Sequence, residues 1–379
     1  INENSGDYPV YSSQTANNGI MGYLNSYDFD GPCVTWTTDG ANAGRVFFRK
    51  GRFNCTNVCG TMHPKSSEVF LPYFPYLLNI GTKYYVRYDI NPKLMNGEMA
   101  RVDICFPDFK EQQAIAGFLE HKTSLIDTLI SKKQRQIKLL QEYRTTIINQ
   151  AVTKGLSPTV RMKDSGVRWL GSIPNHWEIC PIKYVCTINR DALTNSTPED
   201  FELKYIDISS IDSTGKIDTP KQYHFAEAPS RARRIIKKND IIISTVRTYL
   251  RAVAFIDSED KNLIASTGFA TLTANNKINP RFLFRFVSSN AFVENVTANS
   301  VGVSYPAINS SEFANLLVCF PPTSEEQEEI VKYIQKKIEK IDKTISNYES
   351  RILLFNEFKK TLISDAVTGK IDVRGYGTD

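Results

Sequence analysis

The sequence predicts an α+β protein with two globular segments of mixed α/β structure, which two long helices separate. Three observations lead to this fold class. Residues 107–156 recur later in the chain, both copies carry the apolar spacing of a coiled coil, and the segment before each copy contains short β-type runs between turn residues. We therefore expect the two helices to pair as an antiparallel coiled coil, related by an internal pseudo-two-fold repeat.

The repeat is found by adding 215 to each residue number of the first copy. The matched residues of the first copy are Glu111-Gln112, Ile126-Asp127, Leu139, Glu142 and Ala151-Val152-Thr153. Their counterparts are Glu326-Gln327, Ile341-Asp342, Leu354, Glu357 and Ala366-Val367-Thr368. Just before them, Cys105-Phe106-Pro107 is echoed by Cys319-Phe320-Pro321, with one extra residue before the second helix. The segment occurs twice, and the offset between the copies is more than half the length of the chain. Such a repeat indicates a duplicated module rather than a solenoid, whose repeats are short and numerous.

Each copy is predicted to be one long helix. Pro107 and Pro321 stand before or at its start, because proline lacks the N–H that a helix interior requires. Ser324 is the expected N-cap of the second helix. Apolar residues recur at spacings of three and four, and the helix should form a rod of roughly 65 Å at 1.5 Å per residue. Ile126 and Ile341 are expected to face each other at the shared midpoint.

The alternative arrangement is two separate amphipathic helices, each covering its own globular segment. Lys122, Lys133 and Lys337 fall on the apolar stripe and count against a coiled coil. The stripe is narrow, has charged flanks and extends over about six heptads, which favours the coiled coil.

The composition is that of an ordinary globular protein, with 41% apolar and 23% charged residues. No apolar run approaches the ~20 residues needed to cross a membrane, and no signal peptide is visible, so we expect no membrane partner. Seven scattered cysteines, an odd number, are typical of reduced thiols in the cytoplasm. A net charge of +5 is mild. The location of the cations must therefore indicate whether nucleic acid is a partner.

The two helices set the expected domain boundaries. In chain order these are a first globular segment at 1–106, a spacer helix at 107–156, a linker at 157–176, a second globular segment at 177–320, a second spacer helix at 321–372 and a tail at 373–379.

The first globular segment reads as short strands with one helix. β-type runs cover Gly6 to Tyr11, Cys33 to Thr37 and Gly44 to Phe48, and Val69 to Ile80 is predicted to be helical. Cations cluster between Arg45 and Arg52, including Arg49, with no acid among them. Cations contact phosphates, whereas amides and hydroxyls reach base edges. The candidate contacts are Ser12, Ser13, Gln14, Asn17, Asn18, Thr37, Arg45, Lys50, Arg52 and Asn57. The alternative is a solvated basic hairpin.

The second globular segment is also predicted to contain short strands and a few helices. Its predicted strands are Lys204 to Ser209, Asp240 to Thr245, Ala252 to Ile256 and Ala270 to Thr273, and its predicted helices are Pro280 to Val287 and Ser289 to Val296. Between Arg231 and Arg251 the only acid is Asp240. A basic strand and loop with an interleaved aromatic is typical of a duplex-binding surface. The candidates are Arg231, Arg233, Arg234, Arg247, Tyr249 and Arg251. The alternative is a solvated basic edge strand.

Catalytic motifs are missing. The sequence contains no Gly-rich phosphate loop, no HExxH and no paired CxxC. It also lacks the Asp/Asn-Pro-Pro-Tyr/Phe and Phe-x-Gly-x-Gly motifs expected of an amino-methyltransferase. Cys55, Cys59 and His63 are spaced by four, but no second pair completes a zinc site, so we interpret them as core or loop residues. We therefore expect a binding protein without a catalytic site, metal or cofactor of its own.

In its architecture and its helix motifs, the chain resembles the specificity subunit of a type I restriction-modification system. The resemblance rests on Pro107 to Gln113, Ala151 to Leu156, Asp164 to Val167, Trp169 to Pro174, and Pro321 to Gln327 with Ala366 to Lys370. It implies two target-recognition domains that each read half of a split, non-palindromic double-stranded DNA target. It also implies helices that act as spacers and docking sites for two methyltransferase subunits, with restriction or translocase subunits as further partners. S-adenosylmethionine would then belong to the methyltransferase partner.

The start of the chain departs from the family pattern. It begins at Ile1 and lacks a first stretch like Trp169 to Pro174, so we expect a preceding piece that resembles residues 157–176, and a first domain that is incomplete without it. Two other functional classes remain as alternatives. One is a coiled-coil adaptor that joins proteins without reading DNA, and the other is a stand-alone DNA-modifying enzyme.

Overall fold

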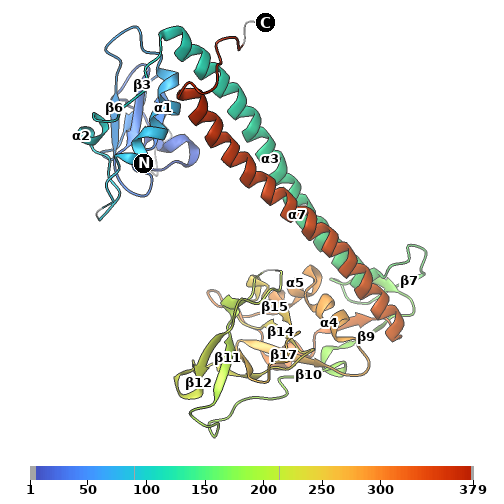
Figure 1. Cartoon of the computed structure of the whole chain (residues 1–379). Coiled ribbons are helices and arrows are strands. Elements are labelled where there is room, and N and C mark those ends of the chain that lie inside the picture. The colour runs from blue at the N-terminus through green and yellow to red at the C-terminus, as the bar shows by residue number, and fades with distance from the viewer. Residues whose placement is uncertain (1–5, 89, 213, 377–379) are drawn as a thin grey trace. The chain divides into compact units, whose positions relative to one another are not determined.

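The computed structural model describes residues 6–88, 90–212 and 214–376 as two compact units. Unit 1 combines Ile1–Arg135 with Asn347–Asp379, and unit 2 is Gln136–Ser346. Each unit contains a globular part of mixed α/β structure together with half of each long helix (Figure 1). This confirms the predicted α+β fold class.

Unit 1 contains two small sheets and a few short helices. Its first sheet has the order β2 (Ile20–Leu24), β1 (Tyr8–Tyr11), β5 (Asn54–Cys55), and its second has the order β4 (Val46–Arg49), β3 (Cys33–Thr37), β6 (Cys59–Met62). The short helices are α1 (Phe74–Gly81) and α2 (Asn96–Met99). The central strand β3 is buried along its whole length, which explains its continuous apolar and threonine composition. Its Val34 and Trp36 pack in one core with Leu77 of α1.

Unit 2 contains a larger α/β core. Its two main sheets have the orders β10 (Cys186–Ile188), β17 (Phe269–Ala274), β14 (Ile241–Ser244), β15 (Val253–Phe255), and β12 (Lys221–His224), β11 (Glu202–Ile206), β16 (Leu263–Ser266), β13 (Ala232–Ile235). The two-stranded pairs are β18 (Leu317–Phe320) with β9 (Glu178–Pro181), and β7 (Met162–Asp164) with β8 (Ser172–Pro174). The helices are α4 (Pro280–Val287), α5 (Asn290–Ala298) and α6 (Ser310–Ala314).

The two long helices are α3 (Phe109–Lys154) and α7 (Ser324–Val367), with 46 and 44 residues. In unit 1, Lys359 Nζ lies 2.6 Å from Asp127 Oδ2, and in unit 2, Arg144 Nε lies 3.5 Å from Asp342 Oδ1. Also within unit 1, Lys133 Nζ lies 4.0 Å from the centre of the Tyr348 ring, so the partner number on α7 falls as the residue number rises along α3. The helices are therefore antiparallel, as predicted.

The expected pairing of Ile126 with Ile341 is wrong. Asp127, next to Ile126, pairs with Lys359, whereas Ile126 itself packs in a core with Leu362. The repeat matches Ile126 to Ile341 by sequence, but Asp342, next to Ile341, contacts Arg144, so the two isoleucines lie beside different stretches of the other helix.

The start of α7 also differs from the prediction. The Glu326 N–H donates to Thr323 Oγ1 over 3.4 Å, and Ser324 is already the first helical residue. The N-cap is therefore Thr323. At the start of α3, the Glu111 N–H donates to Asp108 Oδ1 over 2.9 Å in the same way. Both caps satisfy backbone donors that the first helical turn leaves without partners.

Residues 157–176 are more than a connection. Ile173 and Leu170 are buried in the main core of unit 2, and Trp169 packs edge-on against Phe286 and Phe292. The aromatic and apolar residues that carried the family resemblance in this stretch therefore have a packing role.

Matching tripeptides before the two helices differ in exposure. Cys319 and Phe320 are buried in β18, which pairs with β9. Cys105 and Phe106 are exposed, and no strand pairs with them in the described part of unit 1. Strand pairing, rather than the tripeptide itself, decides whether these side chains are buried.

Candidate nucleic-acid interface

In unit 1, the buried Arg49 positions the loop that carries two candidate amides. Its side chain is only 2% exposed, and its guanidinium carbon lies 3.5 Å from the centre of the Tyr11 ring. Arg49 Nη1 donates to the carbonyl of Asn18 over 2.7 Å. Asn17 and Asn18 have left-handed φ values of 48° and 52°, which asparagine tolerates better than most residues, and both are exposed. The loop is thus held from inside while its amides remain accessible.

Asn42 is hydrogen-bonded to both Ser13 and Arg45, two of the candidate contacts. Asn42 Nδ2 donates to the Ser13 carbonyl over 3.1 Å, and the Arg45 N–H donates to Thr37 Oγ1 over 3.1 Å. Thr37 is 1% exposed, and its hydroxyl donates to the Asn42 carbonyl. The hydroxyl is therefore engaged within the turn, and Thr37 is not available to contact DNA. Arg45 is exposed.

Lys50 and Arg52 follow β4, at the opposite end of this strand from Arg45. Both are exposed. Arg52 Nε lies 3.2 Å from Asp30 Oδ2, and its guanidinium carbon lies 4.6 Å from the centre of the Tyr27 ring. The cations of the first unit therefore form two groups rather than one patch.

The remaining polar candidates of unit 1 are accessible to different degrees. Asn57 is exposed in the turn between β5 and β6. Ser12 and Gln14 are half-buried, and Gln14 Nε2 donates to the Ile20 carbonyl. Asn57 is thus the most accessible of the three.

In unit 2, Arg247 and Tyr305 form an exposed pair, and Tyr249 is exposed two residues after Arg247. Arg247 follows β14 with φ of 52°, a left-handed value that is uncommon for a residue other than glycine. Its N–H donates to the Pro306 carbonyl over 2.8 Å, and its guanidinium carbon lies 4.5 Å from the centre of the Tyr305 ring. Tyr249 and Tyr305 are 54% and 60% exposed. Sequence reasoning missed Tyr305 because this contact joins segments that are far apart in the chain.

Arg251 is directed toward α5. It also has a left-handed φ of 55°. Its Nη1 donates to Asn290 Oδ1, and its Nη2 lies 3.5 Å from Glu294 Oε1. The structure therefore separates Arg251 from Arg247, although the sequence places them four residues apart.

Arg231, just before β13, differs in exposure from Arg233 and Arg234 within the strand. Arg231 is exposed, whereas Arg233 and Arg234 are half-buried. The Arg233 guanidinium carbon lies 4.7 Å from the centre of the Phe225 ring. Burial lowers the pKa of Arg234, and its Nε has no hydrogen-bond partner among the described residues. Of the three, Arg231 is the most accessible to a phosphate.

Cys55 and Cys59, two of the residues spaced by four, contact each other. A hydrogen bond with Cys59, together with burial, raises the pKa of the Cys55 thiol. Within residues 6–88, 90–212 and 214–376, no group of three or more His, Cys, Asp or Glu residues could hold a metal ion.

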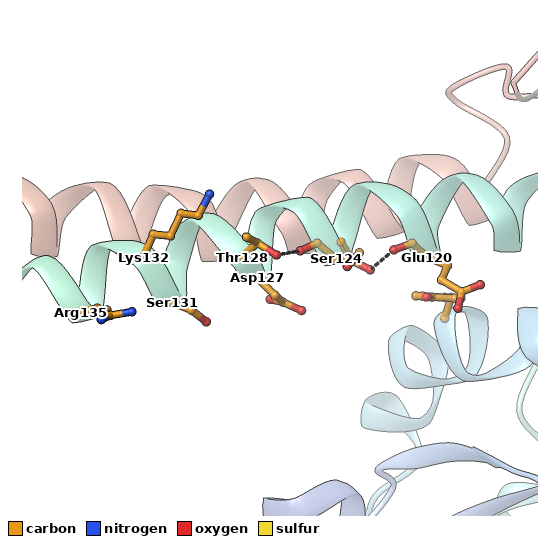
Figure 2. A pocket seen from close by; sticks show the side chains of 9 residues that line it. Glu120, Ser124, Asp127, Thr128, Ser131, Lys132 and Arg135 are labelled. Atoms are coloured by element: carbon orange, nitrogen blue, oxygen red, sulfur yellow. Dashed lines mark hydrogen bonds between the residues drawn. The ribbon is translucent and has the colours of Figure 1, made fainter.

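A polar groove of about 660 Å³ runs along α3 in unit 1. Figure 2 shows its side chains on successive turns, where the Thr128 hydroxyl donates to the Ser124 carbonyl over 2.9 Å. Its two acids, Glu120 and Asp127, lie toward one end, and its two cations, Lys132 and Arg135, lie toward the other. The groove therefore carries both signs of charge, whereas the charged residues among the candidate DNA contacts are all cations.

Residues 1–139 and 174–348 match the family described as the type I restriction modification DNA specificity domain. The chain belongs to this family. The match covers most of the chain, so the recognition made from the helix motifs is confirmed.

Three relatives of this specificity-domain protein come from Mycoplasma pneumoniae. The chain is 44% identical over 121 residues to the putative type I specificity subunit S.MpnORF289P N-terminus, covering 32% of this chain and 65% of the relative. It is 37% identical over 147 residues to the putative subunit S.MpnORF507P, covering 38% and 40%. It is 34% identical over 154 residues to the MpnII specificity subunit, covering 39% and 46%. The alignments thus span less than two thirds of each relative's length.

Two solved structures share the fold of this specificity-domain protein. A chain from a study of complex assembly and conformational transition of the type I R-M system has a TM-score of 0.72 and 14% identity, covering 96% of this chain and 92% of that chain. The HsdS subunit from Thermoanaerobacter tengcongensis has a TM-score of 0.51 and 14% identity, covering 91% and 82%. At this identity the likeness concerns the fold alone.

Among the described residues, no helix is both long enough and apolar enough to cross a membrane.

Proposed function

We propose that this chain is the sequence-specific DNA-binding subunit of a type I restriction-modification complex. It reads a bipartite, non-palindromic target and holds the methyltransferase and restriction subunits that act on the DNA in the cytoplasm. One observation carries the proposal: a single chain contains two segments of the DNA specificity family, and each has its own exposed cations.

The difference between the two globular parts is the reason to expect two different half-sequences. Dimeric DNA readers bind palindromes because identical subunits meet identical half-sites. Here the repeat is confined to the long helices, whereas the sheets of the two units differ in strand number and order. Two unlike surfaces on one scaffold suit a target with unlike halves.

Arg247 is our proposed base reader in the second half-site. It is exposed, its backbone is fixed by the Pro306 carbonyl, and Tyr305 supports its guanidinium. A fixed guanidinium can donate twice to guanine O6 and N7. Arg231 is our proposed phosphate contact, since it is exposed beside an edge strand. Tyr249 completes the accessible surface around Arg247.

In the first half-site, we assign phosphate contacts to the exposed Arg45, Lys50 and Arg52. Asn17 and Asn18 are the proposed base contacts, because a side-chain amide presents both a donor and an acceptor to a base edge. The other candidates are proposed as additional DNA contacts in the two half-sites. They are Ser12, Ser13, Gln14, Asn57, Arg233, Arg234 and Arg251.

Two equivalent apolar patches support docking of two methyltransferase subunits. Leu139 and Tyr143 are more than half exposed on α3, and so are Leu354 and Phe358 on α7. Adding 215 converts the first pair of positions into the second. Exposed apolar side chains on a helix suit a partner helix. The mixed-charge groove on α3 also suits a protein partner better than DNA.

The chemistry is assigned to the partners. In this proposal S-adenosylmethionine binds the methyltransferase subunit, and the chain supplies specificity without a catalytic site. The two rival classes make different predictions. A stand-alone enzyme would modify or cleave DNA without partners, and an adaptor would not bind duplex DNA at low salt.

The test is to sequence methylated sites in host DNA when this chain is expressed with its methyltransferase partner. We expect one split motif with a constant unread gap, and no such motif in a host that carries the methyltransferase alone. Filter binding of the purified chain to mixed duplex DNA at low salt provides the second measurement. Methylation that does not depend on this chain would reject the proposal.

A further inference from the structure

Unit 2 contains a cavity of about 320 Å³ where α3 meets α4 and the start of α5. Arg144, Arg251 and Arg285 line it, and its lining includes no Asp or Glu. Three guanidinium groups around one cavity repel one another unless an anion lies between them.

The protein's own contacts use only part of the donor capacity of these arginines. Arg144 Nε lies 3.5 Å from Asp342 Oδ1, Arg251 Nη2 lies 3.5 Å from Glu294 Oε1, and Arg285 Nη2 donates to Gln335 Oε1 over 3.0 Å. Each guanidinium has five N–H donors in a planar fork. None of the three forms a short, bidentate pair with a carboxylate in these contacts.

Two buried donors beside the cavity lack hydrogen-bond partners among the described residues. They are Ser288 Oγ and Arg144 Nε, and both residues line the cavity. Arg144 Nε faces Asp342 Oδ1 at 3.5 Å as an ion pair without a hydrogen bond, whereas Ser288 Oγ has neither. A buried polar atom without a partner costs free energy, so native proteins usually satisfy it with a protein group, a water or a ligand. Two such donors at one cavity indicate an acceptor that binds there.

The local electrostatics also favour a negative ligand. Burial, followed by repulsion from Arg144 and Arg281, lowers the pKa of Arg285 to about 10. The N-terminus of α5, at Ser289 and Asn290, lines the same cavity and adds the positive end of a helix dipole. Its Asn290 N–H already donates to Asn149 Oδ1 over 2.9 Å, so the helix contributes its field rather than this donor. The positive charges of the arginines and the positive end of the helix both raise the electrostatic potential in the cavity. An anion bound there would be stabilised by this potential.

We propose that this cavity binds a phosphate group. Planar guanidinium groups and a hydroxyl are donors with which proteins hold phosphate oxygens, and the positive end of a helix dipole favours the negative charge. The cavity volume is near the lower limit of small-molecule sites, and Phe284 and Val253 add apolar surface to its wall. Free phosphate, a small phosphate ester and a DNA backbone diester share this chemistry. The proposal does not depend on the DNA-reading function.

The test uses the full chain in phosphate-free buffer, with ionic strength held constant by sodium chloride. Isothermal titration with inorganic phosphate should show saturable binding to one site, and phosphate should raise Tm. Arg285→Gln and Ser288→Ala should each weaken phosphate binding, by at least about tenfold for Arg285→Gln, which removes a charge-assisted hydrogen bond. Circular dichroism of both variants checks their folding, and Ser288→Ala keeps the test valid if Arg285→Gln does not fold.

Arg281→Gln is the matched control. It removes one positive charge from the same helix, but Arg281 is exposed, bonds to Asp257 over 3.0 and 3.2 Å, and does not line the cavity. Phosphate binding by this variant should equal that of the wild type. A loss as large as that of Arg285→Gln would mean general charge attraction and would overturn the proposal.

A DNA measurement separates the two sources of phosphate. Wild-type binding of inorganic phosphate that both cavity variants lose assigns a free phosphate or phosphate ester. If inorganic phosphate does not bind, but Arg285→Gln weakens DNA binding equally on all sequences and lowers the salt slope by about one, the ligand is a backbone diester. Folded variants that change neither measurement overturn the proposal. If the chain binds no duplex DNA, the proposed function fails, and the phosphate titration still decides this inference.

Discussion

Gln112 and Gln327 make the same set of hydrogen bonds at the starts of α3 and α7. In each, Oε1 accepts one backbone N–H and Nε2 donates to two backbone carbonyls. The partners of Gln112 are the N–H of Phe70 at 2.8 Å and the carbonyls of Glu68 at 3.0 Å and Pro107 at 2.9 Å. Those of Gln327 are the N–H of Asn279 at 2.6 Å and the carbonyls of Lys277 at 3.1 Å and Pro321 at 2.8 Å. Both glutamines are buried, so these bonds fasten each long helix to its own globular part.

This arrangement predicts that Gln112→Glu destabilises the protein. The change replaces an amide donor with a carboxylate oxygen that faces two carbonyls in a buried site. We expect a loss of about 1–3 kcal/mol in the free energy of unfolding, measured by urea denaturation. Gln113→Glu is the control, because Gln113 is the adjacent helical residue and is exposed. Equal stability of the two variants would show that the buried bonds contribute little.

The antiparallel register predicts a specific crosslink within one chain. In a Cys105→Ser background, which removes an exposed native thiol, Asp127→Cys with Lys359→Cys should crosslink readily with a short bismaleimide. The two side chains form an ion pair in unit 1, so their replacements lie within reach of the reagent. Gel mobility and mass spectrometry distinguish monomer from dimer. Crosslinks found only between chains would exclude the intramolecular pairing, and each single-cysteine variant controls for random reaction.

The two kinds of arginine contact predict different losses in DNA binding. Arg247→Ala should cost ~1–3 kcal/mol on the preferred target and relax specificity at one position, because it removes a base-reading side chain. Binding to a library of duplexes measures both effects. If affinity and sequence preference remain unchanged, Arg247 belongs to a solvated edge and the site assignment is wrong.

Arg231→Ala provides the comparison within the same unit. It should weaken binding to all sequences by a similar factor and reduce the salt slope by about one, because a phosphate contact carries no sequence information. Titration at several salt concentrations measures the slope. A change of preferred sequence in this variant would contradict its assignment to the backbone.

The helices are expected to set the unread gap between half-sites. Deleting residues 132–138 and 347–353 together removes one heptad from each helix, about 10 Å or roughly three base pairs. Both deletions lie between the Asp127–Lys359 and Arg144–Asp342 contacts, so those pairs and the apolar seam stay in phase. Methylation-site sequencing should find both half-sequences with a changed number of base pairs between them. An unchanged gap in a folded, active variant would assign the spacing to DNA bending instead.

Much of the local structure could be predicted because it depends on neighbouring residues. The strand from Cys33 to Thr37 and the helix from Pro280 to Val287 were predicted with the bounds that the structure has. Turn residues and proline restrict the backbone conformation of residues within a few positions. Apolar periodicity indicates a helix once it extends over a few turns. The family motifs in the long helices are local in the same sense.

The candidate site could be predicted only in part. Arg247 and Tyr249 follow a strand and were found from composition, but Tyr305 comes from a distant loop. Thr37 was chosen as a polar residue at a strand end, yet the fold buries it. Arg49 and Arg45 look alike in a basic run, although one holds a loop from inside and the other is exposed. Exposure depends on what the rest of the chain packs against each residue.

By itself, the sequence determined the duplication, the two helices and the family, because these are periodic or local patterns that need no knowledge of folding. Tertiary structure alone decided the antiparallel register, the shared bonding of Gln112 and Gln327, and the convergence of Arg144, Arg251 and Arg285 on one cavity. Each of these joins residues far apart in the chain. Such contacts form only when packing brings distant segments together, so no local pattern encodes which partners will meet.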